Sequence, residues 1–224
     1  MQTDGVKKLL DRFGFGWFLS SREEIKRVTL SDIEVIPLLG NFDSGFALGE
    51  YRTIEGAKRK RTKVGDLLHK FKYEQNRHAG MILADLASDF INSQIIFKSS
   101  DLMLTVPPSF KSRSFDPVCF LAERIEERTQ IRWERDVLTR TKLTKPQKSI
   151  HDREFKKINV LNTFQLAEPL KLDGKRILLI DDILASGATL NEVSAILREA
   201  KADKINVLVL TKTVGFKGRG FFKQ

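Results

Sequence analysis

The stretch RILLIDDILASGATLNEV, Arg176 to Val193, contains the pattern that decides the fold. Its apolar run, Ile177 to Ile180, has the length and composition of a buried strand. Two adjacent aspartates, Asp181 and Asp182, follow at once, and small residues then lead into a segment with helical spacing. The sequence therefore predicts a strand that ends at Ile180, a ligand-binding loop and a helix, with both acids at the carboxyl end of the strand.

The rest of the chain extends this pattern to an α/β fold. The apolar run Leu102 to Val106 stops at two prolines, as a buried parallel strand would, and a third apolar run begins at Ile205. Helical spacing of apolar residues begins at Gly80 and again at Asp116. Strands that alternate with helices in this way indicate a parallel sheet flanked by helices, with right-handed crossovers.

Composition and length predict a folded protein with one main domain. Of the 224 residues, 41% are hydrophobic and 30% charged, which is ordinary globular usage. Residues 1–45 are expected to form a small N-terminal appendage with a short helix and a strand that ends at Gly40. Residues 46–224 are expected to form the α/β domain.

Several classes of protein are disfavoured by what the sequence lacks. No apolar run approaches the roughly 20 residues that a membrane-spanning helix needs, and no signal-peptide pattern begins the chain. We therefore expect no membrane span and a cytoplasmic location. Cys119 is the only cysteine, so an internal disulfide and a cysteine-rich zinc cluster are both excluded.

A net charge of +10 favours polyanionic partners, namely nucleic acid, phosphorylated small molecules or an anionic membrane surface. The basic run Lys58 to Lys63 predicts an exposed loop or strand extension, for which a solvated surface is the simpler interpretation. The polar and basic segment 139–165 is too long for an idle connection. It indicates a functional lid or a mobile insertion.

The acid pair and the loop after it predict a site for a sugar phosphate. Carboxylates at the end of a strand suit polyol hydroxyls or a bound Mg²⁺. Small side chains let the backbone of the loop approach a ligand closely, and Gly187 permits a positive φ. Backbone N–H groups at the start of the helix, with the hydroxyls of Ser186 and Thr189, would bind a phosphate.

Three other interpretations share parts of this pattern. A Walker B strand also ends in acids, but no G-x-x-x-x-G-K-[ST] motif precedes this one. A receiver domain carries an aspartate pair after its first strand, but too few residues follow here to complete that fold. Thr189 or Asp182 could also simply be the N-cap of the helix, which is compatible with a ligand site or with none.

At these residues the chain resembles the type I phosphoribosyltransferases, whose motif is an apolar strand, two acids, two apolar residues and a T-T-G-x-T-like loop. The resemblance implies binding of phosphoribosyl pyrophosphate (PRPP). Asp181 and Asp182 would bind the ribose hydroxyls. The 5′-phosphate would lie on the loop formed by Ala185, Ser186, Gly187, Ala188 and Thr189. Ala185 stands where many members have threonine, so the loop has one hydroxyl fewer for the phosphate.

Further segments narrow the resemblance to the ComF family of competence-associated, phosphoribosyltransferase-like proteins. They are LLHKFKYEQNRHAG, LTVPPSFKSRSFD, the stretch from RTKLTKPQ to NVLNTF, and the acid-pair motif, in that order between about Glu50 and Thr213. The resemblance implies that Lys111 and Arg113 bind pyrophosphate. It also implies that Arg140 and Lys142 act in catalysis, from a flexible hood over the site.

Two departures from the ComF pattern are visible. The chain has no cysteines where ComF proteins usually carry a zinc ribbon, and SRSFD replaces the usual R-G-F-N. The first departure concerns the zinc-dependent partner contact of ComF proteins, and the second concerns the loop that would bind pyrophosphate in catalysis.

The resemblance implies two functions. As an enzyme, the protein would transfer the phosphoribosyl group of PRPP to an unknown acceptor, with Mg²⁺ carried by PRPP rather than held by the protein alone, and with Asp181 and Asp182 as candidate contacts to it. As a binding module, it would sense PRPP or a nucleotide, or bind DNA as an accessory protein in competence and DNA uptake. A homodimer is a further expectation.

Overall fold

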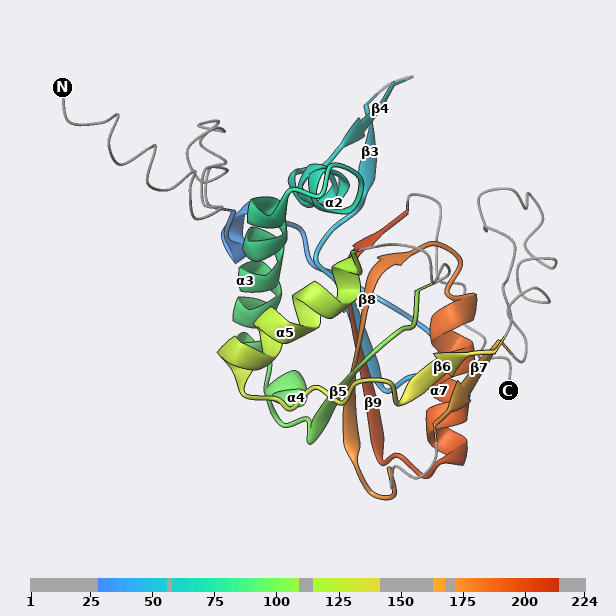
Figure 1. Ribbon diagram of the computed structural model, residues 1–224. Coiled ribbons are helices and arrows are strands. Elements are labelled where there is room, and N and C mark those ends of the chain that lie inside the picture. The colour runs from blue at the N-terminus through green and yellow to red at the C-terminus, as the bar shows by residue number, and fades with distance from the viewer. Residues whose placement is uncertain (1–27, 56–57, 109–114, 142–162, 168–171, 214–224) are drawn as a thin grey trace.

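The computed structural model describes residues 28–55, 58–108, 115–141, 163–167 and 172–213 (Figure 1). A five-stranded sheet forms the centre of this part of the chain. In spatial order its strands are β1 (Ile36–Pro37), β2 (Ser44–Ala47), β9 (Lys204–Lys212), β8 (Arg176–Leu184) and β5 (Leu102–Thr105). All neighbours pair in parallel except β1, which lies antiparallel to β2 at one edge. The three buried strands expected from the sequence are therefore adjacent.

Helices cover both faces of the sheet, as Figure 1 shows. Leu178 and Ile180 of β8 face the core that α3 (Arg77–Ser93) and α5 (Pro117–Thr129) complete. Their neighbours Ile177 and Leu179 face the opposite core, which includes α7 (Ala188–Glu199). Alternate side chains of a strand point to opposite faces, so a continuous apolar run is what a strand buried on both faces requires. The predicted α/β fold with flanking helices is confirmed.

Helix α2 (Lys63–Tyr73) lies at the carboxyl end of the sheet, and a close backbone contact determines its position. The side chain of Thr62 accepts a hydrogen bond from the backbone N–H of Gly65 and so caps the helix. A Cβ on Gly65 would lie 2.0 Å from the carbonyl oxygen of Tyr51, so only glycine allows this approach. The buried Leu68 and Phe71 then bind α2 to the core.

Two antiparallel hairpins extend from the sheet. The first, β3 (Arg52–Glu55) with β4 (Lys58–Arg61), projects away from the body next to α2 (Figure 1). It contains the basic run for which the sequence predicts a loop or strand extension. The second, β6 (Leu138–Arg140) with β7 (Phe164–Leu166), lies beside α7. Residues 142–162 of the expected hood lie outside the described residues.

The remaining described elements are short. A 3-10 helix, η2 (Leu30–Asp32), and β1 belong to the part of the chain expected as an appendage. Leu38 there is buried in the core beside α7, so the described residues 28–45 pack on the same sheet as the rest. Helix α4 (Ile95–Lys98) follows α3. No helix in the described ranges is long and apolar enough to cross a membrane.

Strand β8 differs from the prediction at its end. It continues to Leu184, and Asp181 still pairs with Val209 of β9, so the expectation that the strand ends at Ile180 is wrong. The sequence signal was misleading because charged residues rarely occur inside a buried strand. The N-cap of α7 is Gly187, which also rules out Thr189 and Asp182 in that position.

Candidate functional site

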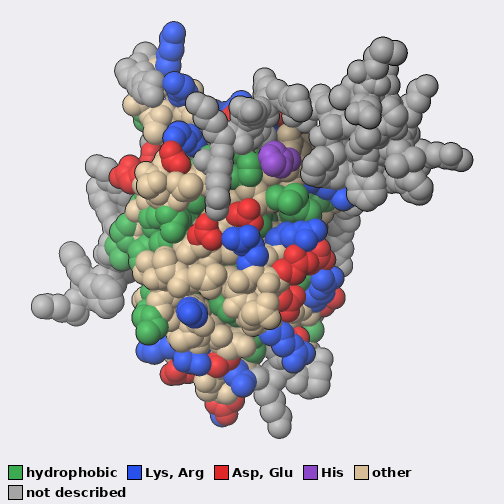
Figure 2. All heavy atoms as spheres, turned by 90° about the vertical axis from the view of Figure 1, so that its left-hand side faces the viewer, with side chains coloured by type: hydrophobic (Ala, Val, Ile, Leu, Met, Phe, Trp, Pro, Cys, Tyr) green, Lys and Arg blue, Asp and Glu red, His purple; other side chains and the backbone are tan. Residues whose placement is uncertain are grey.

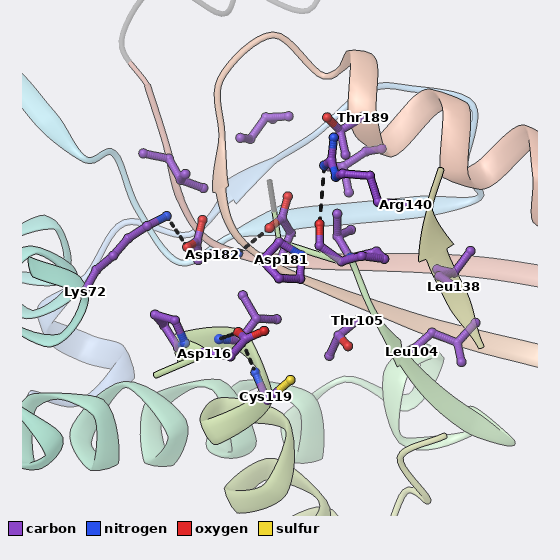
Figure 3. Close-up of a pocket in the computed structure, with 18 of the residues that line it drawn as sticks. Lys72, Leu104, Thr105, Asp116, Cys119, Leu138, Arg140, Asp181, Asp182 and Thr189 are labelled. Carbon is purple, nitrogen blue, oxygen red and sulfur yellow. Dashed lines mark hydrogen bonds and ion pairs between the residues drawn. The ribbon is translucent and has the colours of Figure 1, made fainter. Parts of the chain in front are cut away.

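A cavity of about 890 Å³ opens at the carboxyl ends of β5 and β8 (Figure 3). Its walls come from α2, the start of α5, β6, β8 and the start of α7, which are far apart in the sequence. The polar and charged side chains that line it include Lys72, Thr105, Asp116, Arg140, Asp181, Asp182, Ser186 and Thr189. The site therefore has acidic, basic and hydroxyl groups around one space.

The two aspartates of β8 have different surroundings. Because they are consecutive residues of a strand, their side chains leave opposite faces of the sheet. The carboxylate of Asp182 forms an ion pair with Lys72, which reaches it from the last turn of α2 (Figure 3). Burial lowers the pKa of Lys72, but the attraction of Asp182 raises it by more, so the lysine stays charged.

Asp181 lies on the side of Arg140 (Figure 3). Its Oδ1 accepts a hydrogen bond of 2.8 Å from the backbone N–H of Asp182. Burial raises the pKa of Asp181 to about 7, and the neighbouring charge of Asp182 adds to this, against the attraction of Lys72 and Arg140. The fold therefore makes the ionised form of Asp181 less stable than in water, which is typical of groups in binding and catalytic sites.

Arg140 is held over the cavity by contacts along its length. Its guanidinium donates to the carbonyl oxygen of Pro107, at 3.3 Å, and lies 4.4 Å from the ring centroid of Phe164 on the partner strand β7. Burial lowers the pKa of this guanidinium, against the attraction of Asp181 and Glu192. Arg140 thus joins β6, β7 and the chain after β5 at the rim of the site.

Glu192 of α7 attaches this hairpin to the helix. Its Oε1 accepts hydrogen bonds from the backbone N–H groups of Thr163, at 2.7 Å, and Phe164, at 3.3 Å. The backbone N–H of Thr141 in turn donates to the carbonyl oxygen of Thr163, at 2.8 Å. The base of the expected hood is therefore bound to the same helix that begins at the predicted phosphate loop.

The loop before α7 has the geometry expected of an anion site. Gly187 adopts a left-handed conformation, with φ of 76°, and is the N-cap residue. Ala188 donates weakly to Ser186 Oγ, at 3.5 Å, and no side-chain cap of α7 occurs among the described residues. Ser186, Gly187 and Thr189 all line the cavity. Backbone N–H groups at a helix start and two hydroxyls therefore face one space.

The wall opposite the loop is formed by α5 and the chain before β6. Asp116 caps α5, accepting from the N–H groups of Val118, at 2.9 Å, and Cys119, at 3.2 Å. Burial and the neighbouring Asp116 raise the pKa of the Cys119 thiol to about 12. This thiol is therefore unreactive at neutral pH. Leu104 and Trp133 give this wall an apolar character.

The donor atoms do not fit a metal ion held by the protein alone. Asp182 is engaged by Lys72 and Asp181 leans toward Arg140, so the two carboxylates do not converge. Within the described ranges there is no cluster of three or more histidine, cysteine, aspartate or glutamate residues suited to a metal. The described residues of the cavity therefore do not by themselves form a metal site.

The structure brings together most of the residues that the sequence predicts for the site. The cavity is lined by Asp181, Asp182 and Arg140, and by Ala185, Ser186, Gly187 and Thr189 of the loop, but not by Ala188. Lys111, Arg113 and Lys142 lie outside the described residues. Sequence reasoning missed Lys72, Asp116 and Glu192. Lys72 belongs to the segment LLHKFKYEQNRHAG, but no spacing rule connects it to an acid 110 residues away.

Comparison with known proteins shows the family of the domain that contains this cavity. Residues 72–215 match the family described as phosphoribosyl transferase domain. The DNA utilization protein YhgH of Escherichia coli O6:H1 is 28% identical over 102 residues, which cover 46% of this chain and 44% of that protein. The same protein of strain K12 is 26% identical over the same length. The chain thus spans less than half the length of the curated relatives it matches.

Solved phosphoribosyltransferase structures are more distant. Adenine phosphoribosyl transferase from Trypanosoma brucei, in complex with AMP, pyrophosphate and ribose-5-phosphate, is 12% identical, with a TM-score of 0.46 and coverage of 86% of this chain and 93% of that one. Glutamine PRPP amidotransferase from B. subtilis is 17% identical, with a TM-score of 0.43 and coverage of 63% and 30%. The domain match covers more than half of the chain, and with the YhgH relatives it identifies the protein as a ComF-like member of the phosphoribosyl transferase domain family.

Proposed function

We propose that this protein binds PRPP, as its magnesium complex, in the cavity at the carboxyl edge of the sheet and transfers the phosphoribosyl group to a nucleophilic acceptor. One observation carries the proposal. The acids of β8 and the left-handed start of α7 face the same space, so hydroxyl acceptors and a phosphate site lie within one ligand's reach. The cavity also falls within the roughly 300–1,000 Å³ typical of small-molecule sites.

The parts of PRPP match different walls. The ribose hydroxyls would donate to the carboxylates of Asp181 and Asp182, and the 5′-phosphate would accept from the first N–H groups of α7 and from Ser186 and Thr189. Pyrophosphate would lie toward Arg140. The sequence predicts further charges for it at Lys111 and Arg113, and a catalytic residue at Lys142.

In the reaction, the bond between ribose C1 and the pyrophosphate oxygen breaks and a bond from C1 to the acceptor forms. Pyrophosphate leaves with the bonding electron pair, and the acceptor loses its proton to solvent or to a carboxylate of the site. Fixed positive charge near the leaving group stabilises the transition state more than the ground state. Arg140 is the described residue placed for this role, because Pro107 and Phe164 hold it in position.

The test is a calorimetric titration with PRPP, with and without Mg²⁺, of the wild type and of the variant Asp181→Asn/Asp182→Asn. We expect binding by the wild type only with Mg²⁺, and loss of binding in the variant. Thermal unfolding checks that the variant is folded, because Asp182→Asn leaves the buried charge of Lys72 without its partner. Acceptors are then screened for pyrophosphate release, using purines, pyrimidines and amines. Absence of PRPP binding to the wild type would refute the proposal.

A second function, binding of nucleic acid, is favoured by the β3–β4 hairpin. All four residues of β4, Lys58–Arg61, are exposed, and Figure 2 shows lysine and arginine side chains at the protruding end of the molecule. Arg52 lies directly opposite Arg61, a like-charge pair that destabilises a two-stranded ribbon. Basic residues retained at such a cost suit a polyanion, and relatives are called DNA utilization proteins.

This second function is tested by fluorescence anisotropy with labelled DNA across a salt series. The variant Lys58→Gln/Arg59→Gln/Lys60→Gln is compared with Lys98→Gln/Arg132→Gln/Lys175→Gln, which removes the same charge from exposed positions elsewhere. We expect the slope of log K against log salt to fall by about 0.9 for each duplex phosphate that the hairpin variant no longer neutralises, and to stay unchanged in the control. Equal effects of both variants would show that net charge alone attracts DNA.

The cytoplasmic location and the homodimer that we expect from the sequence remain predictions. Cell fractionation and sedimentation of the purified protein test them.

A further inference from the structure

The ion pair between Lys72 and Asp182 is unusual in this protein because it is largely buried. The side chains are 18% and 9% exposed, whereas most other ion pairs of the described residues join side chains at the surface. The pair connects α2 to β8 across 110 residues of sequence. It therefore joins two elements that form different walls of the cavity.

Stability of the fold does not explain this pair. The pair lines the cavity and lies next to a core that includes Leu68 and Phe71 of α2 and Ile180 of β8. Taking two charges out of water costs several kcal/mol for each ion, and apolar residues of similar volume are often as stabilising as the pair or more so. The charges at these positions therefore suggest a role in the site.

The geometry divides the acid pair between two cations. Asp182 is paired with Lys72 from α2, and Asp181 lies on the side of Arg140 from β6. Adjacent carboxyl groups in a buried place tend to share a proton, because two neighbouring negative charges repel each other. A lysine held against one of them keeps that carboxylate ionised and in one orientation.

We propose that Lys72 is a positioning residue of the PRPP site, which holds Asp182 as an ionised acceptor for a ribose hydroxyl. This inference rests on the proposed function and adds α2 to the machinery that binds the sugar. Lys72 acts through Asp182 in this role, so its effect on PRPP binding depends on that carboxylate.

The first test compares three variants by calorimetry with Mg²⁺ and PRPP. Lys72→Met removes the charge and is expected to weaken PRPP binding by roughly 10- to 100-fold. Lys72→Arg keeps a cation and is expected to restore affinity to within about threefold of the wild type. The control, Lys70→Met, removes a lysine of the same helix whose pair with Asp66, at 3.3 Å, is more exposed, and should leave affinity unchanged.

The second test is a double-mutant cycle with Asp182→Asn. A residue that acts only through Asp182 gives non-additive effects, so Lys72→Met/Asp182→Asn should bind PRPP about as well as Asp182→Asn alone, within roughly threefold. This comparison remains decisive if Lys72→Met unfolds, because the double variant contains neither buried charge. Additive effects would mean that Lys72 contacts the ligand independently, and would overturn the proposal.

The outcomes separate this inference from the function on which it rests. If the wild type does not bind PRPP, both fall. If the wild type binds and Asp181→Asn/Asp182→Asn does not, but Lys72→Met binds as the wild type does, only the role of Lys72 is refuted. If Lys72→Arg has the melting temperature of the wild type but does not restore PRPP binding, the role of Lys72 is also refuted.

Discussion

At the two ends of strand β8 the fold shifts the pKa of an aspartate in opposite directions. At the amino end, Arg176 pairs with Asp101 at 2.8 Å, close to the surface, and this contact lowers the pKa of Asp101 to about 2. At the carboxyl end, burial raises the pKa of Asp181 to about 7. The same sheet thus stabilises an ionised acid at one edge and destabilises one at the other.

This difference indicates which edge has a function. Lowered acid pKa values mean that the ionised form is stabilised by the fold, as in the contacts of Asp101 and of Asp43 with Arg198 and Lys204. A raised pKa means that the fold makes the ionised form less stable, as is common for groups in binding and catalytic sites. Parallel sheets bind ligands at the carboxyl ends of their strands, and the electrostatics here follow that rule.

The largest expected effect comes from removing acids at each edge in turn. Asp181→Asn/Asp182→Asn should weaken PRPP binding by roughly 100-fold or more, because both hydroxyl acceptors change. Asp43→Asn/Asp101→Asn should leave PRPP affinity unchanged and reduce the free energy of unfolding by roughly 1 kcal/mol, since these pairs are partly exposed. Calorimetry and thermal unfolding measure the two properties. An equal decrease of affinity in both variants would contradict the contrast between the edges.

Two glycines with positive φ allow a second comparison between the two ends of β8. Gly187 has φ of 76° at the carboxyl end of β8, and Gly174 has φ of 69° just before its amino end. Substitution of either by alanine should lower stability by about 1 kcal/mol, because L-residues resist this conformation. Only Gly187→Ala should also weaken PRPP binding, by roughly tenfold, since it disturbs the N–H groups at the phosphate site. Calorimetry that finds similar affinities for both variants would argue against the phosphate site.

The pH dependence of PRPP affinity should follow Asp181. In the proposed function its ionised form accepts ribose hydroxyls, and its pKa is about 7, so affinity should decrease as the pH falls below that value. The decrease approaches about tenfold for each pH unit below the pKa. Calorimetry between about pH 5.5 and pH 8.5 would record this decrease in affinity. The upper limit lies roughly 1.5 units above the pKa. Asp181→Asn should show a flatter profile, and an identical profile in this variant would assign the titration to another group.

The smallest expected effects are on the free energy of unfolding. Its dependence on pH should have opposite signs for the acids at the two edges of the sheet. The pKa of Asp181 is raised from 3.8 to about 7. Its contribution to the free energy of unfolding is therefore fully present below pH 3.8 and is lost as the pH rises through about 7. The pKa of Asp101 is lowered from 3.8, so its contribution is present above pH 3.8 and is lost as the pH falls through about 2.

Chemical unfolding across pH measures this difference. Asp181→Asn should become more stable than the wild type at pH values above about 7, and the advantage should vanish in acid. Asp101→Asn should be less stable than the wild type at neutral pH, by less than about 1 kcal/mol because the pair is partly exposed. Parallel behaviour of the two variants would mean that the edges do not differ in the way the structure indicates.

Much of the fold could be predicted from local sequence. The apolar runs at Leu102 and Ile177 gave strands β5 and β8, and helical spacing gave α3 and α7, because periodicity reflects which faces are buried. The turn before α7 could also be predicted, since a glycine among small residues before a helix is a local signal. The end of β8 could not, because its continuation past Asp182 depends on pairing with β9.

By itself, the sequence determined the order of strand, acids, loop and helix, and this order is the basis for proposing a sugar phosphate as the ligand. Only the tertiary structure decided which basic side chain lies next to which carboxylate. Lys72 comes from α2 and Arg140 from β6, and Glu192 binds the hairpin of Arg140 to α7. The physical reason is that backbone periodicity is set by residues a few positions apart. Contacts between side chains more than a hundred residues apart depend instead on how the helices pack on the sheet.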